Sequence, residues 1–435
     1  MRYLSTNQKA PPASLRDAVL AGLAPDGGLY VPERIPVLEP EFIARLSELT
    51  FPQIAAGVLT PFLDLPAEKV LSLATEAFDF PCPLVPLSDR INSLELFHGP
   101  TLAFKDFGAR FMARLFSELR DPDGPAYTVL AATSGDTGTA VAHGFYGMPG
   151  FRVVILYPSG QVSEVQEKQL TTLGGNVTAL EVSGTFDDCQ KLVKTAFLDK
   201  SLAAQRINLT SANSINIARL LPQTLYFFSA AAKLLKHDRP IIVSVPSGNF
   251  GNLTAGLFAR AMGLPVAKFV AATNRNDVVP QYLSSGVYSP RASIQTLSNA
   301  MDVGNPSNFA RIQWLYKNSL DQIRLDVSGR TYSDEKTLHV IKTVWETNHY
   351  LLDPHGAVGY LALEAELATN PDAVGIFLET AHPAKFIETV EEAIGGSIQM
   401  PERLEATMKK TKHAVPLSNT YEALREFLIG PLEFS

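Results

Sequence analysis

The chain contains very little cysteine: Cys82 and Cys189 are the only two among 435 residues, and they lie far apart. This scarcity excludes a disulfide framework and a CxxC metal site, and it predicts two free thiols in a reducing cytosol. No uncharged apolar stretch approaches the length of about 18 residues that a membrane-spanning helix needs. The first residues, MRYLSTN, include no apolar segment of the kind that a secretory signal requires. We therefore expect a cytoplasmic protein without a membrane partner.

Positive charge is also in short supply. Lysine and arginine together number 37 against 44 aspartates and glutamates, which leaves a net charge of −7. Binding to a phosphate backbone needs a basic face, so this balance argues against a nucleic-acid partner. Apolar residues make up 46% and charged residues 19% of the chain. Such a composition predicts a globular protein with a large core, and the length favours two or three domains.

Short apolar runs alternate with helical patterns over most of the chain. The first 95 residues are rich in proline and indicate helical pieces at 41–49 and 67–78, without a strong strand. Beyond them, an alternation of strands and helices predicts a mostly parallel α/β sheet, whose ligands bind beyond the carboxyl ends of the strands. A helical repeat extends from Ile217 to Leu235. The predicted strands are Tyr127–Ala132, Arg152–Tyr157, Val177–Val182, Ile241–Val245, Phe269–Ala272 and Val374–Leu378.

Lys105 is the first candidate for chemistry. It lies at the start of a helical pattern whose apolar stripe comprises Phe104, Phe107, Phe111, Leu115 and Leu119. An amine in apolar surroundings loses hydration of its charged form, so its pKa falls and it becomes a nucleophile at neutral pH. The alternative is a structural lysine whose stem packs on the aromatic rings while its amine reaches water.

Two predicted strands lead directly into glycine-bearing turns, and each turn begins a helix. The first turn is TSGDTG at 133–138 and the second is PSGNFGN at 246–252. Backbone N–H groups at the amino end of a helix attract anions, and glycine allows close approach. Neither turn matches the nucleotide-binding pattern GxxxxGK[ST]. Ordinary capped turns remain the alternative for each, but with an apolar lysine they favour a cofactor that carries a phosphate.

A third helix start, NSINIAR at 213–219, carries further anion-binding groups. Asn213 or Ser214 is expected to be its N-cap, and Arg219 follows where its guanidinium could reach a phosphate. The alternative is simple capping beside a surface arginine. No metal site is expected: the histidines lack ligand spacing, and Asp187 and Asp188 lie early in a helical pattern, where acidic groups suit the helix dipole.

Together these segments resemble the threonine synthase family of bacteria and fungi, in order and over nearly the whole chain. The shared segments are LFHGPTLAFKDFGARF (96–111), TSGDTG (133–138), VSEVQEKQLTTLGGN (162–176), FDDCQKLVK (186–194), SANSIN (211–216), VPSGNFGN (245–252), LSNAMDVGNPSNF (297–309) and TAHPAKF (380–386). The resemblance implies the fold-type II architecture of pyridoxal-phosphate (PLP) enzymes, like the β subunit of tryptophan synthase. It implies two parallel-sheet α/β domains and a small, mainly helical N-terminal domain.

The same resemblance implies domain bounds and an activity. We expect an N-terminal domain over 1–95, a large PLP-binding domain over 96–125 and 236–435, and a small domain over 126–235. The implied reaction converts O-phospho-L-homoserine and water to L-threonine and phosphate by γ-elimination and β-addition, the last step of threonine biosynthesis. A monomer or a homodimer is expected. The open alternatives are a PLP-dependent threonine or serine dehydratase and a phospho-amine lyase that only eliminates.

Site residues follow from the resemblance position by position. Lys105 would be the Schiff-base lysine and the general base that removes the Cα proton. Thr380 would place its hydroxyl at the pyridine nitrogen, and Asp136 would lie near the ring hydroxyl. The cofactor phosphate would bind at Gly248, Asn249, Phe250, Gly251 and Asn252. The substrate carboxylate would bind at Thr133, Ser134 and Thr137, and the substrate phosphate at Asn213, Ser214 and Arg219.

Overall fold

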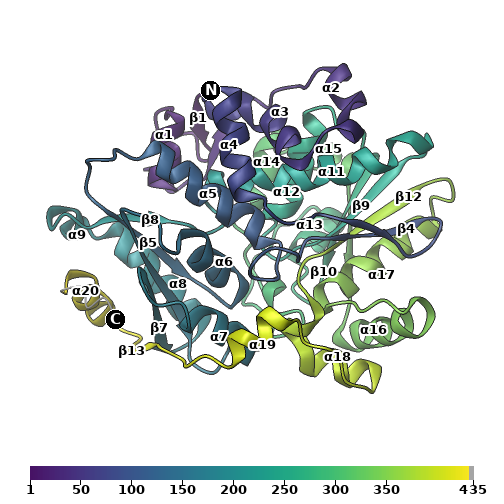
Figure 1. Cartoon of the computed structure of the whole chain (residues 1–435). Coiled ribbons are helices and arrows are strands. Elements are labelled where there is room, and N and C mark those ends of the chain that lie inside the picture. The colour runs from purple at the N-terminus through teal and green to yellow at the C-terminus, as the bar shows by residue number, and fades with distance from the viewer. Residues whose placement is uncertain (431–435) are drawn as a thin grey trace.

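The structure, a computed structural model, describes residues 1–430 and contains two large sheets with helices packed around them (Figure 1). One sheet has six strands in the order β11-β10-β9-β12-β4-β3, and only the β3–β4 pair is antiparallel. Its strands are β3 (Leu84–Pro86), β4 (Ile91–Glu95), β9 (Ile241–Pro246), β10 (Lys268–Thr273), β11 (Val327–Thr331) and β12 (Val374–Glu379).

The second sheet has five parallel strands in the order β13-β7-β6-β5-β8. The strands are β5 (Tyr127–Ala132), β6 (Phe151–Pro158), β7 (Val177–Ser183), β8 (Asn208–Ser211) and β13 (Val415–Ser418). Its helices are α6 (Asp136–Phe145), α7 (Glu164–Thr171), α8 (Phe186–Leu198), α9 (Lys200–Ala204) and the C-terminal α20 (Tyr421–Ile429).

The helices of the remaining chain surround the six-stranded sheet and the N-terminal region. A short antiparallel pair, β1 (Tyr3–Ser5) and β2 (Tyr30–Pro32), accompanies α1 (Leu15–Ala21), α2 (Pro40–Ala44), η1 (Leu46–Glu48), α3 (Phe51–Leu63) and α4 (Ala67–Ala77). The later elements are α5 (Lys105–Leu119), α10 (Ile217–Leu220), η2 (Leu221–Gln223), α11 (Thr224–Leu234), η3 (Leu235–His237), α12 (Gly251–Ala261), α13 (Val278–Ser285), η4 (Asn299–Met301), α14 (Phe309–Leu315), α15 (Leu320–Asp326), α16 (Asp334–Asn348), α17 (Pro354–Ala368), η5 (Pro383–Phe386), α18 (Ile387–Ile394) and α19 (Glu402–Met408).

All six predicted strands are confirmed, with ends that differ by at most one residue. The sequence patterns missed the other seven strands of the described residues, each of three to five residues: β1, β2, β3, β4, β8, β11 and β13. The predicted helix over 217–235 is wrong as one element. It divides into α10, η2, α11 and η3, and Pro222, which lacks a backbone N–H, lies where α10 gives way to a 3₁₀ turn.

The sheets also bear on the predicted domains, whose division stays a prediction. β3 and β4, within the proposed N-terminal domain, pair in the six-stranded sheet. β13, within the proposed large domain, pairs with β7 of the other sheet. Figure 1 shows the C-terminal stretch passing from α18 and α19 to β13 and α20, so this segment links the two sheets.

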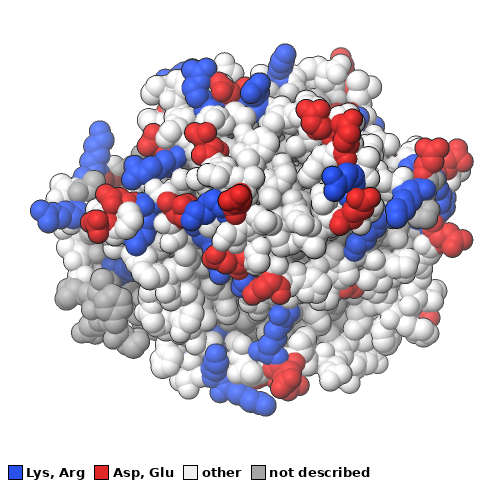
Figure 2. Space-filling view, turned by 45° about the horizontal axis from the view of Figure 1, so that its top comes forward, with Lys and Arg blue, Asp and Glu red and all other residues white. Residues whose placement is uncertain are grey.

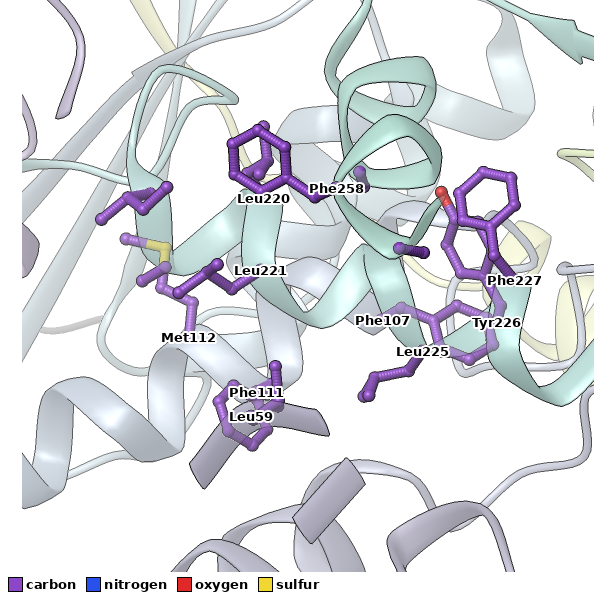
Figure 3. Packing of buried hydrophobic residues seen from close by; sticks show 14 of the residues in the cluster. Leu59, Phe107, Phe111, Met112, Leu220, Leu221, Leu225, Tyr226, Phe227 and Phe258 are labelled. Carbon is purple, nitrogen blue, oxygen red and sulfur yellow. The ribbon is translucent and has the colours of Figure 1, made fainter. Parts of the chain in front are cut away.

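Helix α5 is held at the centre of the largest hydrophobic cluster. Phe107, Phe111 and Leu115 on its apolar stripe are fully buried, whereas Phe104 and Leu119 at its ends are half-buried. The ring of Phe107 lies 5.5 Å from that of Tyr226, and the ring of Phe111 stacks on Phe78 at 5.8 Å. Figure 3 shows these α5 side chains beside Leu59, Leu221 and Leu225. This packing anchors the helix whose first residue is Lys105.

The surface carries charges of both signs. On the face in Figure 2, lysines and arginines are interspersed with aspartates and glutamates and form no basic track. Within residues 1–430, no helix is both long enough and apolar enough to cross a membrane.

Candidate active site

The candidate residues meet at one edge of the six-stranded sheet. β9, β12 and β4 are neighbouring parallel strands, so their carboxyl ends lie together. The turn beginning at Ser247 follows β9, Thr380 follows β12, and the loop that leads to Lys105 follows β4. The topology thereby brings one of the turns singled out by the sequence, together with Thr380, to the same edge as the loop of the lysine.

The loop before Lys105 is folded back by Asp106. Its carboxylate accepts hydrogen bonds from the backbone N–H of Thr101 at 2.9 Å and from the Thr101 hydroxyl at 2.8 Å. Gly99 lies directly beneath: a Cβ there would come within 2.3 Å of the Asp106 carboxylate, so a side chain would break this turn. Leu102 adopts a left-handed conformation with φ of 60°, which bulky residues rarely do. The loop is therefore held in a strained shape that presents Lys105.

Lys105 itself is fixed beside Thr380. The N–H of Phe104 donates to the carbonyl of Thr380 at 2.9 Å, and the Lys105 Nζ lies 4.0 Å from the centroid of the Phe104 ring. Burial, aided by the positive charges of Arg219 and Lys385 and opposed by Asp136, lowers the pKa of Lys105 to about 8. About half of the amine is therefore neutral, and able to act as a nucleophile, at pH 8.

We expect this lowered pKa to be measurable through amine reactivity. When the ligand-free protein is treated with a neutral acetylating reagent and digested, labelling of Lys105 should rise about tenfold per pH unit below pH 8 and level off above it, because only the neutral amine reacts. A free lysine derivative, treated in parallel, should level off only near its ordinary pKa of about 10.4. A Lys105 profile that coincides with that of the free derivative would contradict the burial of the amine.

Asp136, the first residue of α6, is paired with a second buried lysine that the sequence reasoning missed. The Nζ of Lys385 lies 2.7 Å from its Oδ1 and also donates to the carbonyl of Thr101 at 2.9 Å. Gln166 donates to the same Asp136 oxygen at 2.9 Å. Burial alone would raise the pKa of Asp136, but Lys385 and Gln166 outweigh it and the pKa is lowered. Asp136 is therefore an ionised carboxylate that accepts hydrogen bonds, not a neutral carboxylic acid.

In the turn at 133–138, the Thr133 side chain is hydrogen-bonded to the backbone of the turn itself. The Thr133 hydroxyl accepts from the N–H groups of Gly135 and Gly138 at 2.9 and 2.8 Å, so its role is to shape the turn. Gly135 has φ of 136°, and a Cβ there would strike the Gln166 side chain. Among the described residues, no hydrogen bond occupies the N–H or hydroxyl of Ser134 and Thr137. These two half-buried residues thus keep unpaired hydrogen-bond donors in the turn.

The turn after β9 presents a run of free amides. Within residues 1–430, no acceptor pairs with the N–H groups of Gly248, Asn249, Phe250, Gly251 and Asn252. Asn252 uses its side chain to hold the turn: Nδ2 donates to the Pro246 carbonyl at 2.8 Å, and Oδ1 accepts from Ser247. Phe250 adopts φ of 59° as the residue before α12. Such a nest at a helix N-terminus suits a phosphate dianion.

The third helix start differs in part from the expectation. The N-cap of α10 is Asn216, whose Oδ1 accepts from the Ala218 N–H at 3.0 Å, so the expected cap at Asn213 or Ser214 is wrong. The cap lies later because residues 213–216 form a turn, closed by the Asn216 N–H on the Asn213 carbonyl. Asn213 Oδ1 is buried without a partner among the described residues, and the Ser214 hydroxyl accepts from Asn249 at 2.6 Å.

Arg219 is buried against α5 and is not a surface arginine. Its Nη1 donates to the Ala212 carbonyl at 2.7 Å, whereas its Nε has no partner among the described residues. A Cβ at Gly108, three residues beyond Lys105, would meet this Nε at 2.9 Å. Arg219 thus lies along the helix face that carries Lys105. Burial lowers the pKa of its guanidinium to about 10, so it stays charged at neutral pH.

Four polar residues at the site were not predicted: Gln166, Asn308, Arg311 and Lys385. Each lies in or beside a segment quoted for the family resemblance, but none precedes a predicted helix start or follows a strand directly. Only their contacts reveal them, because Lys385 reaches Asp136 across 249 positions and Arg311 reaches Tyr30 across 281. The one signal in the sequence was the lysine of PAKF, which stands between the apolar residues Ala384 and Phe386.

This donor set fits a phosphorylated aldehyde. Lys105 offers an amine of lowered pKa, and the 248–252 turn offers free amides within the same edge of the sheet. Residues 88–378 match the family of pyridoxal-phosphate dependent enzymes. Fold, site and match together define the class as that of fold-type II PLP enzymes.

Two further matches and the relatives specify the family. Residues 2–78 match the threonine synthase N terminus, and residues 356–428 match the threonine synthase C-terminal family. A threonine synthase of Haemophilus influenzae is 47% identical over 415 residues, covering 95% of this chain and 96% of that protein. The chain belongs to the threonine synthase family.

Solved structures agree in fold. The crystal structure of threonine synthase from Escherichia coli has a TM-score of 0.93 and 43% identity, with 99% of each chain covered. The PLP-bound threonine synthase from Brucella melitensis also has a TM-score of 0.93, at 38% identity and 99% coverage of both chains.

Proposed function

We propose that this chain converts O-phospho-L-homoserine and water to L-threonine and phosphate with PLP as its cofactor, the last step of threonine biosynthesis. The observation that carries the proposal is the low-pKa amine of Lys105 at the same sheet edge as the unpaired amides of residues 248–252. The full-length similarity to threonine synthases supports it. We further propose a cytoplasmic monomer or homodimer with the domain division given above.

The cofactor would be held at three points. Lys105 would bind its aldehyde carbon, residues 248–252 would bind its phosphate, and Thr380 would place a hydroxyl at its ring nitrogen. When bound, PLP supplies an electron sink for carbanions beside the substrate amine. Unlike a carboxylate, the Thr380 hydroxyl does not force a proton onto the ring nitrogen.

Asp136 would lie beside the ring hydroxyl as an anion. Lys385 and Gln166 already donate to its Oδ1. Its other oxygen, Oδ2, would accept a proton-bearing partner without taking the proton, because the pKa of Asp136 is lowered. In this reading Lys385 positions Asp136 and keeps it ionised.

Lys105 would also move protons. In its neutral form, the Lys105 amine would remove the Cα proton of the substrate as general base, which its pKa of about 8 allows near neutral pH. Ser134 and Thr137 would orient the substrate carboxylate through their free N–H and hydroxyl groups, with Thr133 shaping the turn. Asn213, Ser214 and Arg219 would hold the substrate phosphate until it leaves from Cγ.

The decisive experiment is phosphate release from O-phospho-L-homoserine by the purified protein supplied with PLP, with the amino-acid product identified by chromatography. We expect stoichiometric phosphate and L-threonine. Release of phosphate with 2-oxobutyrate or vinylglycine instead of threonine would indicate an elimination-only phospho-amine lyase. Activity on threonine or serine without phosphate release would indicate a dehydratase.

Arg219 gives a second prediction at the substrate site. Arg219→Ala should raise the KM for O-phospho-L-homoserine roughly 10- to 150-fold. This corresponds to a loss of about 1.5–3 kcal/mol of binding free energy, because one charge-assisted contact is lost. Because Arg219 is buried, Arg219→Lys should be measured beside it. Lysine keeps the positive charge but lacks the planar guanidinium with its paired N–H donors. Folding is checked by circular dichroism of both variants. An unchanged KM in a folded Arg219→Ala protein would remove Arg219 from the substrate site.

A further inference from the structure

Arg311, in α14, is a fully buried cation without a carboxylate partner among the described residues. Its Nε and Nη2 donate to the Tyr30 carbonyl at 3.0 and 2.9 Å, and Nη2 and Nη1 reach the carbonyls of Ile215 and Ser214 at 2.6 and 3.2 Å. These acceptors are neutral, so the positive charge is not offset. Burial accordingly lowers the pKa of Arg311 to about 9. A buried charge of this kind calls for an anion close by.

The remaining contact of Arg311 orients Asn308. Its Nη1 donates to Asn308 Oδ1 at 2.6 Å. Arginine can only donate, so the amide atom that faces it is the oxygen. The opposite atom, Nδ2, therefore carries the two N–H groups. Asn308 is fully buried, and this Nδ2 has no acceptor within the described part of the chain. A buried donor left without a partner is costly, so its presence indicates a ligand that accepts from it.

The free Nδ2 lies at the start of the eleven-residue helix α12. The position that a Cβ would take on Gly251 is 3.5 Å from Asn308 Nδ2 and 3.9 Å from Ser214 Cβ. Gly251 belongs to the turn whose amides are unpaired. Asn249 ties this turn to its surroundings, because its Oδ1 accepts from the Ser307 N–H at 2.7 Å and its Nδ2 donates to Ser214. Side-chain and backbone donors thus converge on one place.

We propose that Asn308 is a further ligand of the phosphate group of PLP, and that Arg311 is a positioning residue that fixes the Asn308 amide and supplies a compensating charge. This inference rests on the proposed function, which places that phosphate at residues 248–252. A substrate phosphate has the same chemistry. We assign the cofactor phosphate because the free Nδ2 lies 3.5 Å from the Cβ position of Gly251, whose N–H is one of the five unpaired amides of the turn.

The test compares PLP with pyridoxal, which lacks the phosphate. Both aldehydes can react with the same lysine, so the ratio of their dissociation constants, measured by fluorescence titration of apoprotein, isolates the phosphate contribution. Asn308→Ala should weaken PLP binding roughly 10- to 100-fold, the range for one hydrogen bond to a charged group, and leave pyridoxal binding within about threefold. Equal weakening of both aldehydes, or of neither, would overturn the assignment.

A second variant has effects of opposite sign on folding and on binding. Asn308→Asp keeps the shape but gives Arg311 a carboxylate, so the apoprotein Tm should be equal to or above that of the wild type. The same carboxylate would face the phosphate, and PLP binding should weaken by about 100-fold or more while pyridoxal binding persists. Asn305→Asp, the same change at an exposed position of the same loop, is the control and should leave the ratio unchanged.

The outcomes separate this inference from the proposed function. If wild-type apoprotein binds neither aldehyde, the proposed function fails. If it binds PLP far more tightly than pyridoxal and Asn308→Ala keeps the same ratio, only the role of Asn308 fails. If Asn308→Ala raises the KM for O-phospho-L-homoserine but leaves the PLP dissociation constant unchanged, the anion at Asn308 is the substrate phosphate, and the assignment to the cofactor is overturned.

Discussion

Lys105→Ala is expected to lower kcat by at least about 10⁴-fold, the upper range of what a positioned general base contributes, because the same amine would also hold the cofactor. The variant should lack the visible absorbance that PLP acquires when its aldehyde is joined to a lysine. It should still retain PLP reversibly, since the amides of residues 248–252 remain unpaired and free to bind the phosphate.

The control is Lys191→Ala, which removes an exposed lysine on α8 and should leave both the absorbance and kcat unchanged. Spectra recorded before and after gel filtration distinguish bound from free cofactor. If Lys105→Ala keeps the lysine-linked absorbance, another amine holds the cofactor. Lys385 would then be the first to replace, because it is a fully buried lysine that follows β12 at this edge of the sheet.

Lys385→Met is expected to lower the free energy of unfolding of the apoprotein by about 3–5 kcal/mol. The side chains of Lys385 and Asp136 are 0% and 7% exposed, so removal of the lysine leaves a buried, uncompensated carboxylate. The matched control is Lys412→Met. Lys412 pairs with Glu167 and Glu181 at the surface, with 35% of its side chain exposed, and its loss should cost below about 1 kcal/mol.

A double variant tests whether the two buried residues act as a unit. Asp136→Asn in the Lys385→Met background removes the uncompensated charge, so the double variant should be more stable than Lys385→Met alone. Urea unfolding of the four proteins completes the cycle. A loss in Lys385→Met no larger than that in Lys412→Met, or purely additive effects, would show that the ion pair is not a stabilising unit.

The ion pair also predicts how stability depends on pH. The pKa of Asp136 lies below its ordinary value of 3.8 in the folded protein, so the pair contributes fully above that value. Its contribution is lost as the pH falls through the lowered pKa and the carboxyl becomes protonated. In Lys385→Met, the lysine no longer opposes the burial that raises the pKa of Asp136. The difference in free energy of unfolding between this variant and the wild type should therefore shrink as the pH is lowered.

The pair has a structural meaning beyond its energy. Asp136 begins α6, which follows a strand of the five-stranded sheet, whereas Lys385 follows β12 of the six-stranded sheet. Gln169 of α7 also donates to the Thr101 carbonyl at 3.2 Å, the same acceptor that Lys385 uses. The residues proposed to contact the cofactor ring are thus held by contacts that join the two sheets.

The sequence by itself determined the elements that depend on near neighbours. Buried parallel strands are continuous apolar runs, so β5, β6, β7, β9, β10 and β12 were predictable. The apolar stripe of α5 and the glycines after β5 and β9 likewise depend on short-range periodicity and turn geometry, and they indicated Lys105 and both anion turns. Short strands such as β8 and β11 form because neighbouring strands pair with them, and their own residues give little signal.

Only the tertiary structure decided which polar groups lack partners. The sequence could not indicate the proposed roles of Asn308 and Arg311, because these roles depend on contacts of Arg311 with Tyr30 and Ser214, far away in the chain. The ionised state of Asp136 depends in the same way on Lys385. Local sequence fixes where a chain turns and which face is apolar, whereas the field at a buried atom is the sum of charges and dipoles that folding brings within a few ångströms.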